Sequence, residues 1–125
     1  MTDPRRQRAR LGRRERILRT RDFRAVYRAR ARAGDGRIVA YARASGRDVT
    51  RLGVSVGKRC GGAVERNRIK RLLREVFRQA RCDLAPGSGY DVVLVPLGRD
   101  YTFEEVDRRL RALVPEAIRR AERKA

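Results

Sequence analysis

The stretch that decides the fold is RLGVSVGKRCGGAVERNRIKRLLR, residues 51–74. Its first seven residues alternate between apolar side chains and small ones, a pattern that predicts a strand over 51–57. After the loop KRCGG, apolar side chains recur at helical spacing from Ile69 onward, which predicts a helix over 63–82. A strand, a short basic loop and a long amphipathic helix therefore stand at the centre of the chain.

The flanking sequence predicts the remaining elements of one small domain. Phe23, Val26 and Tyr27 are spaced as on one face of a helix, which we expect to begin with Thr20 as N-cap and to end near residue 31. Further strands are predicted over 37–43 and 91–95. The chain has 125 residues, a length that suits a single compact α+β domain in the order α-β-β-α-β-α.

A last helix is predicted to begin at a capping box made by Thr102 and Glu105. Pro115 lies inside its apolar pattern and should kink the helix or end it. Residues 1–16 are basic and lack any period, so we expect a flexible basic arm there and a folded domain over 17–125.

Positive charge is concentrated in two parts of the chain. Lys and Arg number 34 against 15 Asp and Glu, a net charge of +19. Residues 1–34 and 51–82 hold nearly all of this excess, whereas 83–125 is neutral. Such a distribution favours a polyanionic partner, because solubility alone would not require it.

The predicted central helix has a basic face opposite its apolar face. At 100° per residue, one stripe carries Asn67, Lys70, Arg71, Arg74 and Arg78. Like charges on one helix face repel each other and gain no pairing along the helix, so a bound polyanion would relieve them. Gly57, Gly61 and Gly62 precede this helix and suit either a tight turn or the close approach of a phosphate.

Aromatic side chains would supply the other half of a nucleic-acid surface. Phe23 and Tyr27 share a helix face, and Tyr41 lies on the next strand. These rings either fill the core or stack on unpaired bases. Gly53 and Ser55 keep one face of their strand shallow, which suits a cleft for an extended strand of nucleic acid.

Several classes of function are disfavoured by what the sequence lacks. It has no His, the commonest general base and zinc ligand, and no apolar run long enough to cross a bilayer. Cys60 and Cys82 are expected as free thiols in a reducing cytoplasm. A disulfide between them and a mitochondrial transit peptide at the Arg-rich N-terminus are the alternatives.

The block 51–74 closely resembles the protein subunit of bacterial ribonuclease P. The resemblance rests on the GVSV strand and on AV-x-RNR-x-K-R-x-x-R, which begins at Ala63 and ends at Arg74. It covers roughly residues 16–118 and includes the two aromatics of the first helix. It implies the order α-β-β-β-α-β-α with a left-handed crossover, and hence a short additional strand near 30–36.

The resemblance also implies a function. In that family the catalyst is an RNA that uses Mg²⁺ to cleave precursor tRNA, and the protein binds this RNA and the substrate's 5′ leader. The protein itself would have no catalytic residue, metal or cofactor. The leader cleft would comprise Phe23, Tyr27, Tyr41 and Ser55. The surface for the catalytic RNA would comprise Lys58, Arg59, Arg66, Asn67, Arg68, Lys70, Arg71 and Arg74.

Three other functions remain open at this point. A ribosomal or RNA-packaging protein would have the same charge but no cleft selective for a leader. A DNA-binding module is disfavoured because a strand, and not a helix, precedes the basic helix. An autonomous nuclease is disfavoured because no acidic cluster lies in the basic regions. We therefore expect no DNA or membrane partner.

Overall fold

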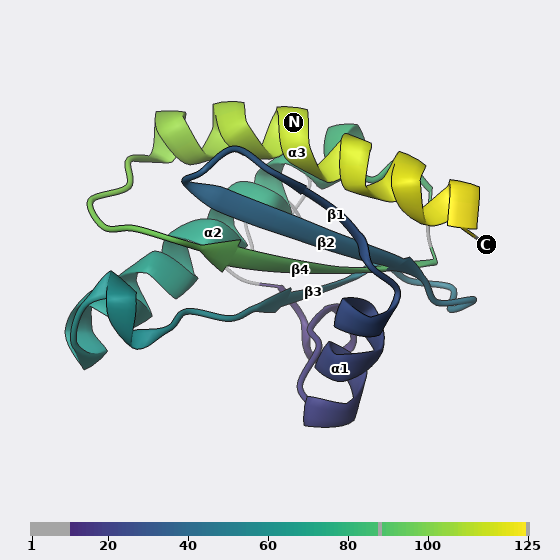
Figure 1. Ribbon diagram of the computed structural model, residues 1–125, viewed down its shortest axis with the longest axis horizontal. Coiled ribbons are helices and arrows are strands. Elements are labelled where there is room, and N and C mark those ends of the chain that lie inside the picture. The colour runs from purple at the N-terminus through teal and green to yellow at the C-terminus, as the bar shows by residue number, and fades with distance from the viewer. Residues whose placement is uncertain (1–10, 88, 125) are drawn as a thin grey trace, which may run out of the picture.

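The computed structural model describes residues 11–87 and 89–124. Its elements follow the order that the resemblance implies (Figure 1). They are α1 (Thr20–Arg28), β1 (Ala31–Gly34), β2 (Ile38–Ala44), β3 (Arg51–Val54), α2 (Ala63–Leu84), β4 (Tyr90–Pro96) and α3 (Phe103–Lys124), with short 3-10 turns η2 (Arg13–Glu15) and η3 (Lys58–Cys60). The predicted α+β class is confirmed, and β1 is the short additional strand.

The four strands form one mixed sheet in the order β1-β2-β4-β3. β2 is antiparallel to both of its neighbours, whereas β3 and β4 are parallel, with Leu52 opposite Val92. Parallel neighbours require a crossover connection, and α2 supplies it. The left-handed sense of this crossover stays a prediction from the resemblance.

The sheet separates two layers of helices (Figure 1). α2 and α3 cover one face and form the main core, which includes Phe77, Leu94 and Leu110. α1 lies on the opposite face, where the buried apolar cluster is small and consists of Ile17, Val26 and Val93. The period-two alternation of the strands sends neighbouring side chains of β4 into different layers.

The structure corrects three predicted boundaries. Arg19, not Thr20, is the N-cap of α1, since its backbone is extended while Thr20 is already helical. That helix ends at Arg28 because Arg30 adopts a left-handed conformation with φ of 59°. α3 continues through Pro115, because buried side chains such as Val114 and Ala117 hold it on the sheet on both sides of the proline.

The domain also begins earlier than predicted. Residues 11–16, assigned above to a flexible arm, are packed against the sheet: Leu11 is buried, and Arg16 forms an isolated parallel bridge with Leu52. The N–H of Ile17 donates to the carbonyl of Leu52 at 2.9 Å. Residues 1–10 of the predicted arm lie outside the described residues.

Candidate nucleic-acid interface

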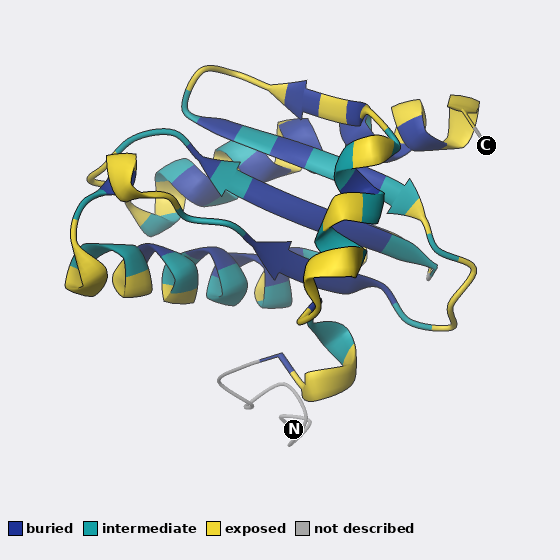
Figure 2. Ribbon diagram, turned by 60° about the horizontal axis from the view of Figure 1, so that its bottom comes forward, coloured by how far each residue is buried: buried dark blue, intermediate teal, exposed yellow. Residues whose placement is uncertain are grey.

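The sheet face that carries α1 is crossed by no other α-helix of the described residues (Figure 2). Strand register aligns Tyr41, Val93 and Gly53 across this face, beneath α1. The adjacent row contains Val39 and Val95, which pair with each other and are only partly buried. Beyond α1, this face is therefore open to a ligand and has an apolar floor.

All four residues predicted for a leader cleft lie on this face or border it. Phe23 and Tyr27 project from α1 and, with Tyr41, pack around the small cluster beneath it, each half-buried. The rings of Tyr27 and Tyr41 meet edge to face with centroids 4.9 Å apart, a favourable aromatic geometry. Ser55 follows β3 directly, and its N–H donates to the carbonyl of Leu94 at 3.0 Å. We name this set the leader cleft.

Gly53 has a specific role in the cleft. A Cβ added there would lie 2.7 Å from Cε1 of Phe23, so only glycine lets that ring rest on the sheet. The sequence predicted a shallow strand face at both Gly53 and Ser55. In the structure this does not hold at Gly53. The aromatic ring of Phe23 fills the space above Gly53.

A buried ion pair that sequence reasoning missed anchors α1 to the sheet. Asp91 is completely buried at the start of β4, and its carboxylate accepts hydrogen bonds of 2.9 and 2.8 Å from Arg51. Arg51 also forms an ion pair with Asp22 of α1 at 3.5 Å. The sequence did contain a signal for this pair. Asp91 lies near the start of an apolar strand, and Arg51 lies at the start of the strand that pairs with it.

The basic residues predicted on α2 divide into two groups. Asn67, Arg68 and Arg71 are exposed, whereas Lys70 and Arg74 are half-buried, with Arg74 near Arg16. Arg66 is also half-buried, and its Nε has no hydrogen-bond partner. The exposed group is therefore available to a macromolecule without any rearrangement of the fold.

Two arginines of this helix have distinct electrostatic environments. Burial lowers the pKa of the Arg74 guanidinium, and the positive charge of nearby Arg16 lowers it further. In contrast, Arg78 forms an ion pair with Glu75 at 2.6 Å, which raises the pKa of Arg78. Arg78 thus belongs to a mixed-charge pair, whereas Arg74 and Arg16 are like charges placed side by side.

The loop between β3 and α2 joins the open sheet face to the basic helix. Lys58 and Arg59 are exposed on η3, while Cys60 is buried beside the carbonyl of Pro96. Gly61 has a φ of 118°, and a Cβ there would lie 2.9 Å from Cβ of Glu65. This glycine therefore permits the turn that starts α2 directly beside the sheet.

The described residues hold neither a cluster of metal-binding side chains nor a helix suited to crossing a membrane. Within 11–87 and 89–124, no group of three or more His, Cys, Asp or Glu side chains is placed to hold a metal ion. Two of the carboxylates near the basic surfaces are paired with arginines, Asp22 with Arg51 and Glu75 with Arg78. None of the described helices has the length and apolar character needed to span a membrane.

These features define a class: a small, arginine-rich α+β protein with an aromatic cleft on one sheet face and a basic helix beside it. The sequence pattern of the ribonuclease P family matches residues 11–118. The ribonuclease P protein component of Shouchella clausii is 41% identical over 93 residues, which cover 74% of this chain and 76% of that protein. The component from Clostridium kluyveri is 36% identical over 104 residues, covering 82% and 93%.

A solved structure agrees with these sequence relatives. The ribonuclease P protein of Staphylococcus aureus superimposes with a TM-score of 0.67 at 29% identity, over 78% of this chain and 90% of that one. The chain belongs to the ribonuclease P protein family. Membership makes it the protein component of an RNA-binding ribonucleoprotein endoribonuclease that supports 5′ maturation of tRNA.

Proposed function

We propose that this protein binds the catalytic RNA of ribonuclease P through α2 and captures the 5′ leader of precursor tRNA in the leader cleft. The observation that carries the proposal is the junction of the two surfaces. The uncovered half of the sheet ends at the loop with Lys58 and Arg59, where α2 begins. One RNA-bound protein can therefore hold a substrate strand beside its catalytic partner.

The leader cleft suits a single-stranded nucleic acid. Its aromatic rings offer stacking surfaces for unpaired bases, and the apolar row of Val39 and Val95 extends beyond them. No arginine of this face is needed to read base identity, since every base presents an aromatic face to a stacking ring. The cleft would therefore accept leaders of differing sequence.

The exposed face of α2 suits the phosphates of a structured RNA. Arg68 and Arg71 have no carboxylate partner among the described residues, and Asn67, one turn before Arg71, adds a neutral hydrogen-bonding group. Arginine binds phosphate in a bidentate geometry. Gly62 is the N-cap of α2 and has no side chain that could accept a hydrogen bond from the first turn. The backbone N–H groups of that turn are therefore free to bind a further phosphate.

The protein contributes binding and positioning to the reaction, and hydrolysis belongs to its RNA partner. The Mg²⁺ that this reaction uses does not fit the described side chains, because no group of three or more His, Cys, Asp or Glu among them is placed to hold a metal ion. We assign the metal to the RNA. Cys60 and Cys82 are both free, in keeping with the proposed cytoplasmic location.

The two surfaces are tested by one pair of variants. Arg68→Glu with Arg71→Glu should abolish binding of a bacterial ribonuclease P RNA while the thermal midpoint stays unchanged, because both side chains are exposed. Tyr27→Ala should weaken binding of precursor tRNA by about 5- to 150-fold, the loss of one stacked base, and leave binding of leaderless tRNA unchanged.

Tyr90→Ala is the matched control for Tyr27→Ala in the test of leader binding. Tyr90 is half-buried like Tyr27 but hydrogen-bonds Glu122 on the α3 side of the molecule, so it should bind both substrates normally. Equal losses for precursor and mature tRNA in Tyr27→Ala would contradict the leader cleft. Unaltered RNA affinity in the double Glu variant would contradict the α2 surface and favour general RNA packaging.

A further inference from the structure

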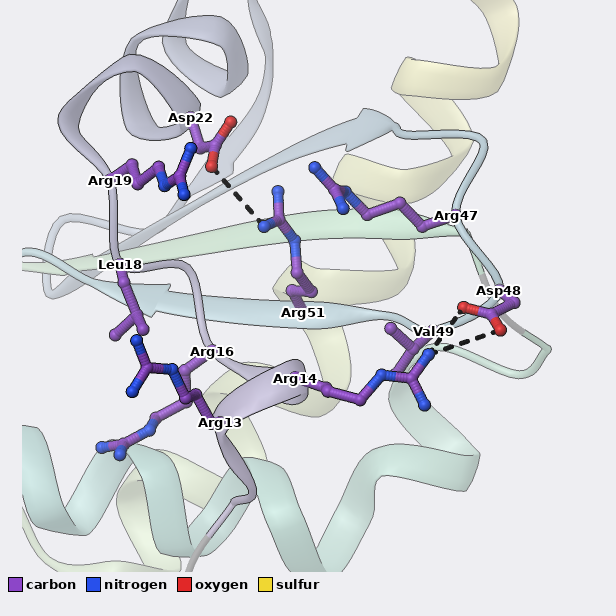
Figure 3. Close-up of a pocket in the computed structure, with 10 residues that line it drawn as sticks. All are labelled: Arg13, Arg14, Arg16, Leu18, Arg19, Asp22, Arg47, Asp48, Val49 and Arg51. Carbon is purple, nitrogen blue, oxygen red and sulfur yellow. Dashed lines mark hydrogen bonds and ion pairs between the residues drawn. The ribbon is translucent and has the colours of Figure 1, made fainter.

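A pocket of about 430 Å³ lies on the far side of α1 from the open half of the sheet (Figure 3). It is formed by residues 13–19, the start of α1 and the turn between β2 and β3. Six arginines line it, against only two acids, Asp22 and Asp48. The six are Arg13, Arg14, Arg16, Arg19, Arg47 and Arg51. We name this site the arginine pocket.

The two acids neutralise only part of this charge. Asp48 pairs with Arg14 at 3.2 Å, and Asp22 pairs with Arg51. No carboxylate of the described residues pairs with the side chains of the other four arginines, and Nε of Arg16 is buried without a hydrogen-bond partner. Of these four, Arg19 and Arg47 lie on the side of Arg51, whereas Arg13 and Arg16 extend toward α2 (Figure 3). Like charges lining one pocket raise its electrostatic energy, which a bound anion would lower.

The arginine pocket is connected to the basic side of α2. Arg16 lies close enough to Arg74 for their charges to interact, and Glu15 forms an ion pair with Arg81 of the same helix. Residues 13–16 therefore extend the positive flank of α2 across the edge of β3. A polyanion that follows α2 meets the arginine pocket at the end of that path.

We propose that the arginine pocket binds backbone phosphates of the same catalytic RNA that occupies α2. The assignment rests on the proposed function and adds a second, separate point of attachment. Guanidinium groups bind phosphate oxygens in bidentate pairs, and the pocket presents six of them around a volume of about 430 Å³. Two attachment points on either side of β3 would fix the orientation of the protein, and thus of the leader cleft, on the RNA.

The test compares salt dependence for the full chain and two double variants. Arg19→Ala with Arg47→Ala removes two exposed arginines that have no carboxylate partner among the described residues. Arg108→Ala with Arg123→Ala removes the same charge from exposed positions on α3. Affinity for a bacterial ribonuclease P RNA is measured between low and high salt, and thermal midpoints verify that each variant is folded.

A plot of log affinity against log salt should have a smaller slope for the pocket variant. Each lost phosphate contact reduces the magnitude of the slope by about 0.7 to 0.9, so two lost contacts reduce it by about 1.4 to 1.8. At physiological salt this corresponds to roughly 20-fold weaker binding, whereas the α3 variant should change less than about twofold. If folding is impaired, Arg13→Ala with Arg47→Ala, both exposed, replaces the first variant with the same expectation.

Two results would overturn the assignment, and they differ from failure of the proposed function. Equal slopes for the pocket variant and the wild type would exclude phosphate contacts in the pocket. Stabilisation of the wild type by inorganic pyrophosphate, lost in a pocket variant whose RNA affinity is normal, would identify a site for small anions instead. If the wild type bound this RNA no better than unrelated RNA of equal length, the proposed function itself would fail.

Discussion

The two faces of the sheet are covered to very different degrees. On one face α2 and α3 bury a continuous core that includes Phe77, Leu94 and Leu110. On the other, α1 buries three apolar residues and leaves its aromatic rings half exposed. Apolar burial dominates stability, so the first face holds the fold and the second is free to bind.

The weakly covered face combines its small apolar cluster with a buried network of ion pairs. Asp91 and Arg51 are buried beneath α1, and Asp22 links that pair to the helix. A buried charge that loses its partner destabilises the fold. Arrangements of α1 that separate these charges are therefore disfavoured. Polar contacts thus help to position α1 on this face, and the aromatic rings that it carries are only partly buried.

The largest effect is expected on the covered face. Phe77→Ala should lower the free energy of unfolding by about 4 kcal/mol, because it removes a fully buried ring and leaves a cavity. Val64→Ala, at a side chain that is 80% exposed, should change it by less than about 0.5 kcal/mol. Urea denaturation measures both, and similar midpoints for the two variants would contradict the division between faces.

A smaller loss is expected at the anchor of α1. Asp91→Ala leaves the guanidinium of Arg51 buried without its main partner, at a cost of about 3 kcal/mol. Asp83→Ala, which breaks an exposed pair with Arg111, should cost less than about 0.5 kcal/mol. In the folded fraction, Asp91→Ala should also weaken leader binding, and normal leader affinity would show that α1 needs no such anchor.

The cleft itself should respond in binding more than in stability. Gly53→Ala places a Cβ against the ring of Phe23, which should cost about 1 to 2 kcal/mol and displace that ring. Gly57→Ala has open space around it and serves as the control. Precursor-tRNA affinity should fall only for Gly53→Ala, and an equal response of both variants would contradict the contact between Phe23 and the sheet.

The smallest effect concerns an ion pair outside both RNA surfaces. The hydrogen bonds from Arg37 hold the pKa of Glu105 below its usual value of 4.5. A lowered pKa means that the charged form is favoured in the folded chain, so this contribution is complete above about pH 4.5 and disappears as the pH falls through the lower, folded pKa.

Glu105→Gln should therefore cost about 1 kcal/mol at neutral pH, and the difference from the wild type should shrink toward pH 3. Glu104→Gln, at an exposed neighbour without a partner among the described residues, should show no such pH dependence. Thermal midpoints across this range give the comparison, and a constant difference at every pH would show that the Glu105 charge is not responsible.

Much of the fold was accessible from the sequence because strand and helix periods are local properties. The helix over α2, the strand at β4 and the capping hydrogen bond from the N–H of Glu105 to Thr102 all follow from spacing. β1 was found only through the resemblance, because ARAG has no β-branched residue and is held by pairing with β2. Long-range pairing of this kind leaves little local signal.

The functional surfaces were predictable to different extents. Periodicity alone placed Arg71 on the exposed face of α2, because a helix fixes the direction of its side chains. It could not show that Phe23 rests on Gly53 or that Arg51 pairs with Asp91, since these contacts join residues 30 and 40 positions apart. The arginine pocket escaped prediction for the same reason, because two segments far apart in the sequence, 13–22 and 47–51, form it.

The most direct test of the account is cleavage of a precursor tRNA at low Mg²⁺ by the protein alone, by a bacterial ribonuclease P RNA alone, and by both together. Cleavage at the mature 5′ end is expected only when both are present, and the gain from the protein should fall when the leader is shortened to a single nucleotide. Cleavage by the protein alone, or no gain from the protein despite intact RNA binding, would contradict the account.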